Sequence, residues 1–518
     1  MMFKNPHQAA ESNASPVASA DEPTGEKNHR VPVLESTLET AEPNTPSISV
    51  PVPFSRQIYI SSAIILCQFV QSIPYGAGIN SALEIGKQLG VGAGESAWIV
   101  AAYPLTQGTF VLMGGRIGAI YGHKNAVAVA GIWWTVWTLI SGFMTNIISL
   151  SVMRALSGIG GAFITPNAIA LLTITFPPGR MRNISVGLFG AMAPVGAAGG
   201  SVFPGFFVQL LPWKWLFFFL AMLGAVIFTL FIFVVPQEPE AMDPDGKIDF
   251  IGAYLGVAGL VLFNFVWNQA PIVGWDKPYE YALLIVSVLH LAAFALWESK
   301  FAADPILPFD IWKAPSFSWM IVSAFFTFMA VGIVIWYMSL WNLQLRHYSL
   351  FLNGAAYATL AVCGAAVAVL SGIAIRHLAA QYIMAIGSLA SAVALTLVAT
   401  MPEQQTYWAQ MFPALIMTAL GPDFLFTASQ IIASNTVKRS QQGIAGSFVA
   451  MILSYGFSTG LGFAGTVEAY TNSNGKDPVQ GYRNALYLGI GMAVCAAVIA
   501  LALVRIPKDR REGWDEDA

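Results

Sequence analysis

Residues 214–235 read KWLFFFLAMLGAVIFTLFIFVV, a run whose single charged side chain, Lys214, stands at its first position. A helix of about 20 apolar residues crosses a hydrocarbon core about 30 Å thick. The run therefore predicts a membrane-spanning helix. Similar runs lie on both sides of it along most of the chain.

This recurrence predicts fourteen spans and an all-α membrane protein. Of the 518 residues, 56% are hydrophobic and 10% charged, whereas soluble domains carry about 25% charged residues. In lipid the backbone must satisfy its own polar groups, which favours helices. The predicted spans are residues 58–78, 96–116, 125–144, 149–175, 184–207, 214–235, 249–269, 281–300, 317–342, 351–375, 381–400, 407–433, 443–467 and 484–506.

The two ends of the chain have a different composition. Residues 1–56 are rich in Ser, Pro, Glu and Thr, and they have too few large apolar side chains to fold. We expect this segment to be a disordered cytoplasmic tail and residues 507–518 to be a second cytoplasmic tail. Most Lys and Arg in short loops fall on the same side as the N-terminus, which predicts cytoplasmic termini. We expect a multi-pass protein of the plasma membrane.

Two polar breaks divide the membrane part. The first, PQEPEAMDPDGKI at 236–248, follows the sixth span, and the second, around Asp304 and Pro305, follows the eighth. Two bundles of similar size suit a carrier whose central site faces each side in turn, although a channel or receptor is compatible with the same number of spans. The predicted parts are an N-terminal six-helix bundle at 57–236, two linker helices at 237–312 and a C-terminal six-helix bundle at 313–506.

The loop between the second and third spans reads GRIGAIYGHK at 115–124. Its glycines allow a tight turn, and its basic residues favour the cytoplasmic side. The loop resembles the signature of the major facilitator superfamily, with matches at Gly115, Gly122 and Lys124. Alanine stands at 119, where the family has an acidic residue of the charge network that holds one conformation. A plain basic turn is the alternative.

The fourth span contains Arg154, with Gly158 one turn later on the same face. An arginine within hydrocarbon is costly unless it meets a wet cavity or a partner. The segment resembles the superfamily's fourth-span signature, which implies a role for the arginine in proton coupling or substrate contact. The alternative is a structural arginine bound to backbone carbonyls.

The fifth span reads GLFGAMAPVGAAGG at 187–200. Small residues allow close helix packing, and Pro194 removes a helical hydrogen bond and bends the helix. Gly190, Pro194 and Gly199 resemble the fifth-span signature of drug-exporting antiporters, with Ala193-Pro194 in place of Gly-Pro. Close packing alone is the alternative.

Asp423 lies near the middle of the twelfth span, and the thirteenth span begins with a stretch that includes Gly443. With the earlier motifs, this part resembles the fourteen-spanner drug:proton antiporter family, especially fungal members of the aminotriazole-resistance and ammonium-facilitator type. The resemblance covers about residues 57–506. It implies the major facilitator fold, two six-helix bundles plus two additional helices. Desolvation would let Asp423 carry a proton; a carboxylate hydrogen-bonded across the break at Pro422 is the alternative.

The first span lacks the acidic residue that many fourteen-spanner exporters carry there. Polar and aromatic side chains offer other cavity candidates, with packing or anchoring at the membrane boundary as the alternative. These candidates are Gln68, Gln71, Trp98, Tyr103, Tyr337, Asn342, Gln344 and Tyr455.

We expect a proton-coupled secondary transporter that exports small amphipathic or weakly charged compounds by alternating access. An uncoupled facilitator for a small polar solute such as ammonium or borate is one alternative, and a non-transporting sensor on a transporter scaffold is another. Motifs of metalloproteases, serine hydrolases and P-loop enzymes are missing, as are His/Cys clusters at metal spacing. We therefore expect no enzyme activity, cofactor or metal. The net charge of −3 indicates no nucleic-acid partner; we expect a monomer that binds its substrate, protons and the lipid bilayer.

Overall fold

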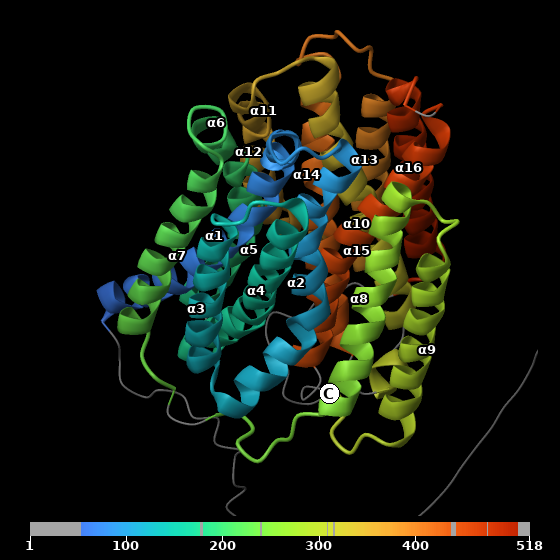
Figure 1. Ribbon diagram of the computed structural model, residues 1–518. Coiled ribbons are helices and arrows are strands. Elements are labelled where there is room, and N and C mark those ends of the chain that lie inside the picture. The colour runs from blue at the N-terminus through green and yellow to red at the C-terminus, as the bar shows by residue number, and fades with distance from the viewer. Residues whose placement is uncertain are drawn as a thin grey trace, which may run out of the picture. The chain divides into compact units, whose positions relative to one another are not determined.

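The computed structural model describes residues 53–176, 180–238, 241–307, 309–313, 316–436, 442–473 and 475–505. These residues form helices joined by turns and short irregular segments, without a β-strand among them (Figure 1). The described helices belong to one compact unit. Nearly all of the predicted N-terminal tail and the whole predicted C-terminal tail lie outside the described residues.

The helices follow one another along the chain with short connections. In order they are α1 (Phe54–Gln88), α2 (Ala93–Tyr121), α3 (His123–Ser141), α4 (Ile147–Thr175), α5 (Arg180–Gly200), α6 (Phe203–Phe207), α7 (Lys214–Val234), α8 (Phe250–Val273), α9 (Pro278–Lys300), the 3₁₀-helix η1 (Phe309–Lys313), α10 (Phe317–Leu340), the π-helix η2 (Trp341–Leu345), α11 (Leu350–Ala356), α12 (Ala358–His377), α13 (Ala380–Ala399), α14 (Met411–Thr436), α15 (Gln442–Thr471) and α16 (Pro478–Ala502).

Every predicted span coincides with a helix or with two helical pieces in succession. The fifth span continues through a turn into α6, the ninth ends in η2, and the tenth is divided at Tyr357 into α11 and α12. Twelve helical stretches in the described residues are long and apolar enough to cross a membrane, and α2 and α3 complete the fourteen. The predicted all-α membrane fold is confirmed.

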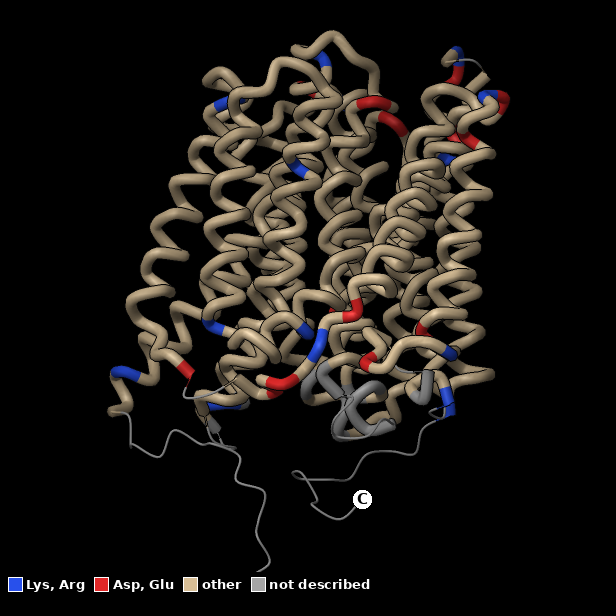
Figure 2. Tube along the Cα trace, turned by 60° about the horizontal axis from the view of Figure 1, so that its bottom comes forward, with Lys and Arg blue, Asp and Glu red and all other residues tan. Residues whose placement is uncertain are grey.

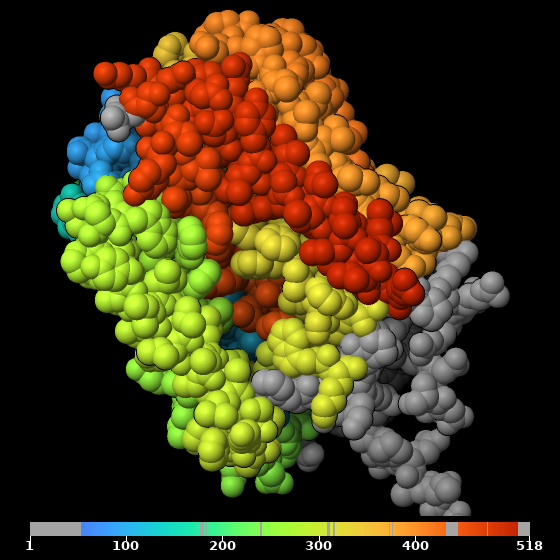
Figure 3. Space-filling model, turned by 90° about the vertical axis from the view of Figure 1, so that its right-hand side faces the viewer, coloured from blue at the N-terminus to red at the C-terminus, as the bar shows by residue number. Residues whose placement is uncertain are grey.

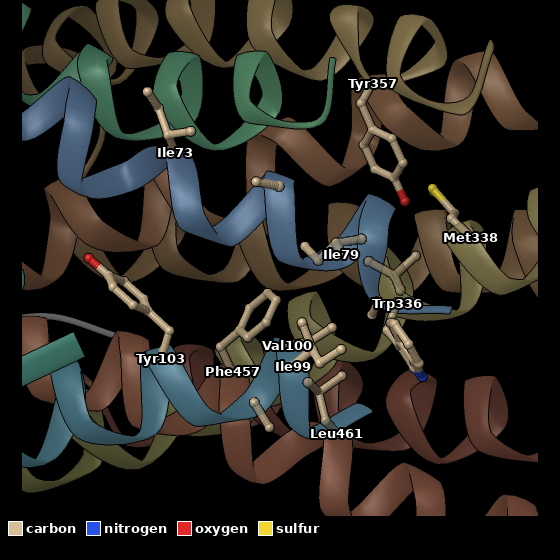
Figure 4. Close-up of a cluster of buried hydrophobic side chains, with 14 of the residues drawn as sticks. Ile73, Ile79, Ile99, Val100, Tyr103, Trp336, Met338, Tyr357, Phe457 and Leu461 are labelled. Atoms are coloured by element: carbon tan, nitrogen blue, oxygen red, sulfur yellow. The ribbon is translucent and has the colours of Figure 1, made fainter. Parts of the chain in front are cut away.

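We call α1–α7 the N-terminal half and α10–α16 the C-terminal half. Within the first, α2 and α3 pack on α4 and α1 packs on α5; within the second, α13 packs on α14 and α16, and α10 packs on α15 and α16. The halves meet mainly where α2 packs on α15 and α5 on α12. Apolar side chains from both halves share a buried cluster, in which Figure 4 shows Ile79, Ile99, Trp336 and Phe457.

Glycines let the two halves approach closely. A β-carbon at Gly108 of α2 would lie 2.7 Å from the backbone nitrogen of Tyr455 on α15. A β-carbon at Gly364 of α12 would lie 2.8 Å from Cβ of Pro194 on α5. Small residues at these crossings therefore set the spacing of the halves.

The helices α8 and α9, which we call the linker pair, lie at one edge of the bundle (Figure 1). Buried amides hold α8 on α15: Asn264 Nδ2 donates to Thr459 Oγ1 (2.9 Å), and Ser458 Oγ donates to Asn264 Oδ1 (3.0 Å). Figure 3 shows this side, where the surface is hollowed beside the linker pair. A cavity of about 380 Å³ there is lined by Phe294, Ala295, Leu307 and Trp312.

Charged residues gather toward the two ends of the helices, and the middle of the bundle in Figure 2 is almost entirely uncharged. Large apolar side chains are exposed on its flanks, including Phe233 at 84% and Val362 at 71%. In water such exposure would be unfavourable. It is the pattern expected of helices surrounded by hydrocarbon.

Candidate functional site

A network of uncharged polar side chains joins α1, α2 and α4. Gln71 lies at its centre: its Nε2 donates to Gln68 Oε1 (2.9 Å), and its Oε1 accepts from Gln107 Nε2 (2.7 Å). Thr165 of α4 donates to Gln68 Oε1 (3.2 Å), and the Tyr103 hydroxyl donates to the Gln71 carbonyl (2.7 Å). The predicted cavity residues Gln68, Gln71 and Tyr103 are thus brought together. We call this group the glutamine network.

Tyr75 extends the glutamine network to the C-terminal half. It follows Gln71 by four residues, so both side chains lie on one face of α1. Its hydroxyl is 2.6 Å from Gln107 Oε1 and 3.1 Å from Ser454 Oγ on α15. Tyr75, Thr165 and Ser454 are partly exposed. The network therefore offers hydrogen-bond donors and acceptors, without a charge, at the contact between the halves.

Arg154 of α4 is 3% exposed and binds backbone carbonyls. Its Nε donates to the Ile99 carbonyl (2.5 Å) and its Nη2 to the Pro74 carbonyl (3.0 Å). The guanidinium carbon is 5.9 Å from the centroid of the Tyr103 ring, a cation–π contact. No carboxylate of the described residues forms an ion pair with it. A β-carbon at the neighbouring Gly158 would lie 2.4 Å from the Tyr103 carbonyl oxygen. Arg154 thus ties α4 to α1 and α2 beside the glutamine network.

Asp423 of α14 lies where the halves meet at α5 and α12. A β-carbon at Gly364, already close to Pro194, would lie 3.5 Å from Asp423 Oδ2. The side chain is half-buried, and within the described part of the chain it makes no hydrogen bond or ion pair, including none with Arg154. A carboxylate with these surroundings is able to take up a proton or a cationic group.

A second carboxylate in the C-terminal half, Glu468 of α15, was not predicted as a site residue. The Tyr337 hydroxyl donates to Glu468 Oε2 (2.7 Å), and the rings of Tyr337 and Tyr482 have centroids 5.6 Å apart. The Tyr482 hydroxyl donates to Gln344 Oε1. Ser454 precedes Glu468 by fourteen residues, about 21 Å along the helix. The predicted residues Tyr337 and Gln344 therefore lie away from the glutamine network.

Asparagines join the halves at the end of the bundle where α6 meets α11. Asn80 Nδ2 donates to the carbonyls of Ser201 (2.5 Å) and Leu350 (2.8 Å). Asn353 Nδ2 donates to Asn80 Oδ1 (2.8 Å), and Asn342 Nδ2 donates to Asn353 Oδ1 (2.9 Å). We call Asn80, Asn342 and Asn353 the asparagine latch and this end the latch end. Two bonds, Asn80 to Leu350 and Asn353 to Asn80, cross between the halves.

Two other predicted cavity residues contact the linker pair. Trp98 Nε1 donates to Gln269 Oε1 (3.0 Å), and the Tyr455 hydroxyl donates to the Leu260 carbonyl (2.8 Å). Both acceptors belong to α8. Trp98 and Tyr455 therefore lie on the side of α2 and α15 that faces α8.

The turn between α2 and α3 is held by the segment that leads to α8. Gly122 has a φ of 91°, which glycine adopts readily. The Glu238 carboxylate accepts from the N–H groups of the first two residues of α3, the second being Lys124, at 3.0 and 2.7 Å. Arg116 pairs with Asp243 (2.6 Å). Carboxylates of a distant segment thus meet a loop that has none of its own.

The glycines predicted on α5 face open space. Nothing lies within 4 Å of where a β-carbon would stand at Gly187, Gly190 or Gly199. Gly187 and Gly190 lie on the same face of α5 as Pro194, the residue that meets α12. The part of α5 before Pro194 is therefore open on this face. Gly443 is in the first turn of α15, and its surroundings lie outside the described residues.

The described residues contain neither a candidate metal site nor a disulfide. They hold no group of three His, Cys, Asp or Glu side chains that could bind a metal ion. Cys67, Cys363 and Cys495 are free thiols.

Sequence reasoning missed several residues of these clusters. Helical spacing from Gln68 and Gln71 was the signal that could have found Tyr75. Glu468 lies one residue beyond the predicted end of its span, in what the hydropathy pattern predicts to be a loop. The missed residues include Tyr75, Gln107, Thr165, Asn353, Ser454 and Glu468.

Comparison with known proteins places the fold and the motifs in one family. The model of the Major Facilitator Superfamily matches residues 64–403. The low affinity ammonium transporter of Saccharomyces cerevisiae is 38% identical over 82% of this chain and 84% of its own. The aminotriazole resistance protein of the same yeast is 34% identical over 82% and 80%, and the efflux pump terJ of Aspergillus terreus is 33% identical over 90% and 92%.

Solved structures agree on the fold. A human organic anion transporter superposes with a TM-score of 0.59 at 12% identity, over 86% of this chain and 99% of that chain. The resemblance to fungal proteins of the aminotriazole-resistance and ammonium-facilitator type is confirmed by the yeast relatives. The chain belongs to the Major Facilitator Superfamily of membrane transporters.

Proposed function

We propose that this transporter exports small amphipathic or weakly charged compounds, such as drugs, toxins or metabolites, by alternating access. The observation that carries the proposal is that the contact between the halves is closely packed at the latch end and less closely packed toward the other end. At the latch end Asn80 and Asn353 join the halves, and a β-carbon at Gly354 would lie 2.4 Å from the Ser201 carbonyl oxygen. Before Pro194, no atom lies within 4 Å of the β-carbon positions at Gly187 and Gly190, on the face of α5 that meets α12 at Pro194. A path closed at one end and open toward the other is one of the two states of such a carrier.

Asp423 is the residue that we assign to proton coupling. It lies beside the contact of α5 with α12, which must change when the halves rock. A proton taken up in one state and released in the other would link export to the proton gradient. Arg154 would act as a fixed positive charge near Tyr103, and Glu468 is a second carboxylate nearer the latch end.

Uncoupled passage of a small polar solute such as ammonium or borate is the second candidate function. The uncharged glutamine network favours it, because Gln68 and Gln71 occupy α1 where a coupling carboxylate is expected. Similarity to the yeast ammonium transporter supports the same function, whereas similarity to the aminotriazole resistance protein and the efflux pump supports export.

Flux measurements in liposomes separate the two functions. Purified protein is reconstituted and assayed with aminotriazole, ammonium and boric acid, each with and without an imposed pH gradient and a protonophore. Export coupled to protons predicts gradient-driven aminotriazole flux that the protonophore abolishes. If the protonophore leaves the flux of every solute unchanged, the protein is an uncoupled facilitator instead.

Variants of acidic residues test the role of Asp423. We expect Asp423→Asn to lose gradient-driven flux and to keep exchange of labelled for unlabelled substrate. Asp276→Asn is the matched control, because Asp276 is exposed in the turn between α8 and α9. Undiminished gradient-driven flux in Asp423→Asn would remove Asp423 from the mechanism.

We further propose that both termini are cytoplasmic, that the latch end faces outward from the plasma membrane, and that the protein acts as a monomer. The asymmetry of Lys and Arg between the loops supports this orientation. The proposed division remains 57–236, 237–312 and 313–506. Epitope tags at both termini should be stained only after cells are permeabilised; staining of either tag on intact cells contradicts the orientation.

A further inference from the structure

Several buried donors near the latch end have no protein partner. Trp341 Nε1, both terminal nitrogens of Arg346 (Nη1 and Nη2) and Arg483 Nε are buried and make no hydrogen bond. Arg346 is 8% exposed and Trp341 0% exposed. Since most buried side-chain polar atoms in proteins are hydrogen-bonded, a group of such donors needs an explanation.

The donors surround one short segment of chain. Arg346 Nε donates to the Glu403 carbonyl (3.1 Å), and Arg483 Nη2 donates to the Met401 carbonyl (3.4 Å), so both guanidinium groups reach the loop before α14. The Arg483 guanidinium carbon is 5.8 Å from the Trp341 ring centroid. The helix η2, the loop at 401–405 and the start of α16 therefore bring these donors to one place.

Neither arginine has an acidic counter-ion among the described residues. The ionisable side chain next to Arg346 is that of Tyr348. Asn342 Oδ1 and Gln405 Oε1 are unpartnered acceptors in the same region, so four of its six unpartnered atoms are donors. A buried cation without a counter-ion is costly. The region therefore carries positive charge and has more unpartnered hydrogen-bond donors than acceptors.

We propose that Trp341, Arg346 and Arg483 form a binding site for an oxyanion, a phosphate or carboxylate group. A guanidinium presents parallel N–H donors that match two oxygens of such a group. The site lies at η2 and just beyond its end, and in the second turn of α16. Both the phosphate of an anionic lipid headgroup and a phosphate from solution carry the required chemistry. The proposal does not depend on which solute the protein transports.

Thermal unfolding with defined probes tests the proposal. Protein in neutral detergent is titrated with inorganic phosphate at constant ionic strength, and protein in phosphatidylcholine nanodiscs is compared with protein in nanodiscs that contain phosphatidylglycerol. Binding to the folded state should raise the unfolding midpoint by at least about 2 °C in one of the two experiments. A rise with free phosphate identifies a site for solution anions, and a rise only with phosphatidylglycerol identifies a lipid site.

Variants locate the effect. Arg346→Gln and Arg483→Gln should each weaken the stabilisation at least fivefold, and Arg346→Lys should keep part of it because it retains the charge without the planar fork. Lys277→Gln is the matched control, since it removes a positive charge from an exposed side chain in the turn between α8 and α9. If neither probe raises the midpoint, the proposal is wrong. It is also wrong if the glutamine variants respond like the wild type, because the bound anion would then be an adventitious ion only.

Discussion

The asparagine latch gives a graded series of variants for testing alternating access. Asn80→Ala removes both hydrogen bonds of the asparagine latch that cross between the halves, and Asn353→Ala removes only the cross-half bond between Asn353 and Asn80. Ser339→Ala removes the bond that Asn353 makes to Ser339 (2.9 Å), which lies within the C-terminal half. The three substitutions therefore remove two, one and zero cross-half bonds.

The expected change in the open population follows from the net free energy that each hydrogen bond contributes to the closed form. When the latch end opens, water satisfies the same amides, so each bond favours the closed form by only about 1 kcal/mol. The ratio of open to closed molecules should rise about fivefold in Asn353→Ala and about thirtyfold in Asn80→Ala. From an open population of about 1%, these factors give about 5% and about 25%.

Pulsed electron paramagnetic resonance measures the two populations directly. Spin labels at Leu210 and Leu352, exposed by 69% and 49%, report the separation of the halves at the latch end. Cys67, Cys363 and Cys495 must first be replaced, because each is a free thiol. The distance distribution in nanodiscs should gain a longer component that grows from Ser339→Ala to Asn353→Ala to Asn80→Ala.

Two outcomes would refute the reasoning. An unchanged distribution in Asn80→Ala would mean that the asparagines do not hold the halves together. An equal longer component in Ser339→Ala would mean that disturbance within the C-terminal half, rather than loss of cross-half bonds, opens this end.

Three further variants test contacts elsewhere. Gly108→Ala should abolish most transport without loss of protein from the membrane, because its β-carbon would lie 2.7 Å from the Tyr455 nitrogen. Gly190→Ala, whose β-carbon has nothing within 4 Å, should transport at nearly the wild-type rate in the same flux assay. Equal rates for the two variants would contradict the close-packing argument. Glu238→Gln should lower stability by about 1 kcal/mol, read as a lower unfolding midpoint, because the helix N-terminus loses its carboxylate; an unchanged midpoint would show that the capping bonds contribute little. Arg154→Lys should also unfold earlier, because an ammonium is a compact point charge that cannot reproduce the planar fork binding two separate carbonyls, and a midpoint equal to the wild type would show that the charge alone suffices.

The membrane fold was predictable because the hydropathy pattern shows which stretches of the chain are apolar and long enough to cross the hydrocarbon. It does not show where a helix ends, since helices continue into the headgroup region. The first span was predicted to end at residue 78, but α1 continues to Gln88 and brings Asn80 into the latch. The seventh span was predicted in spite of Asn264 and Asn268, and these amides proved to be its contacts with α15.

The candidate site was predictable only in part. Gln68 and Gln71 are recognisable because polar side chains on an apolar helix are costly unless paired. Their partners were less accessible: Asn353 bonds to a residue 273 positions away, and no local pattern carries that information. Likewise, the loop at 115–124 lacks an acidic residue, but Asp243 reaches its Arg116 from a segment beyond α7.

The position of α8 makes the two flanks of the carrier unequal. A solute dissolved in the bilayer that approaches the crossing of α2 with α15 meets α8, which the side-chain amides of Asn264 and Gln269 hold there. At the crossing of α5 with α12 it meets aliphatic side chains such as Leu188 and Val362, exposed by 48% and 71%, and no described helix lies over them. Of the two crossings between the halves, α8 therefore covers one, and the other, where α5 meets α12, lies beside Asp423.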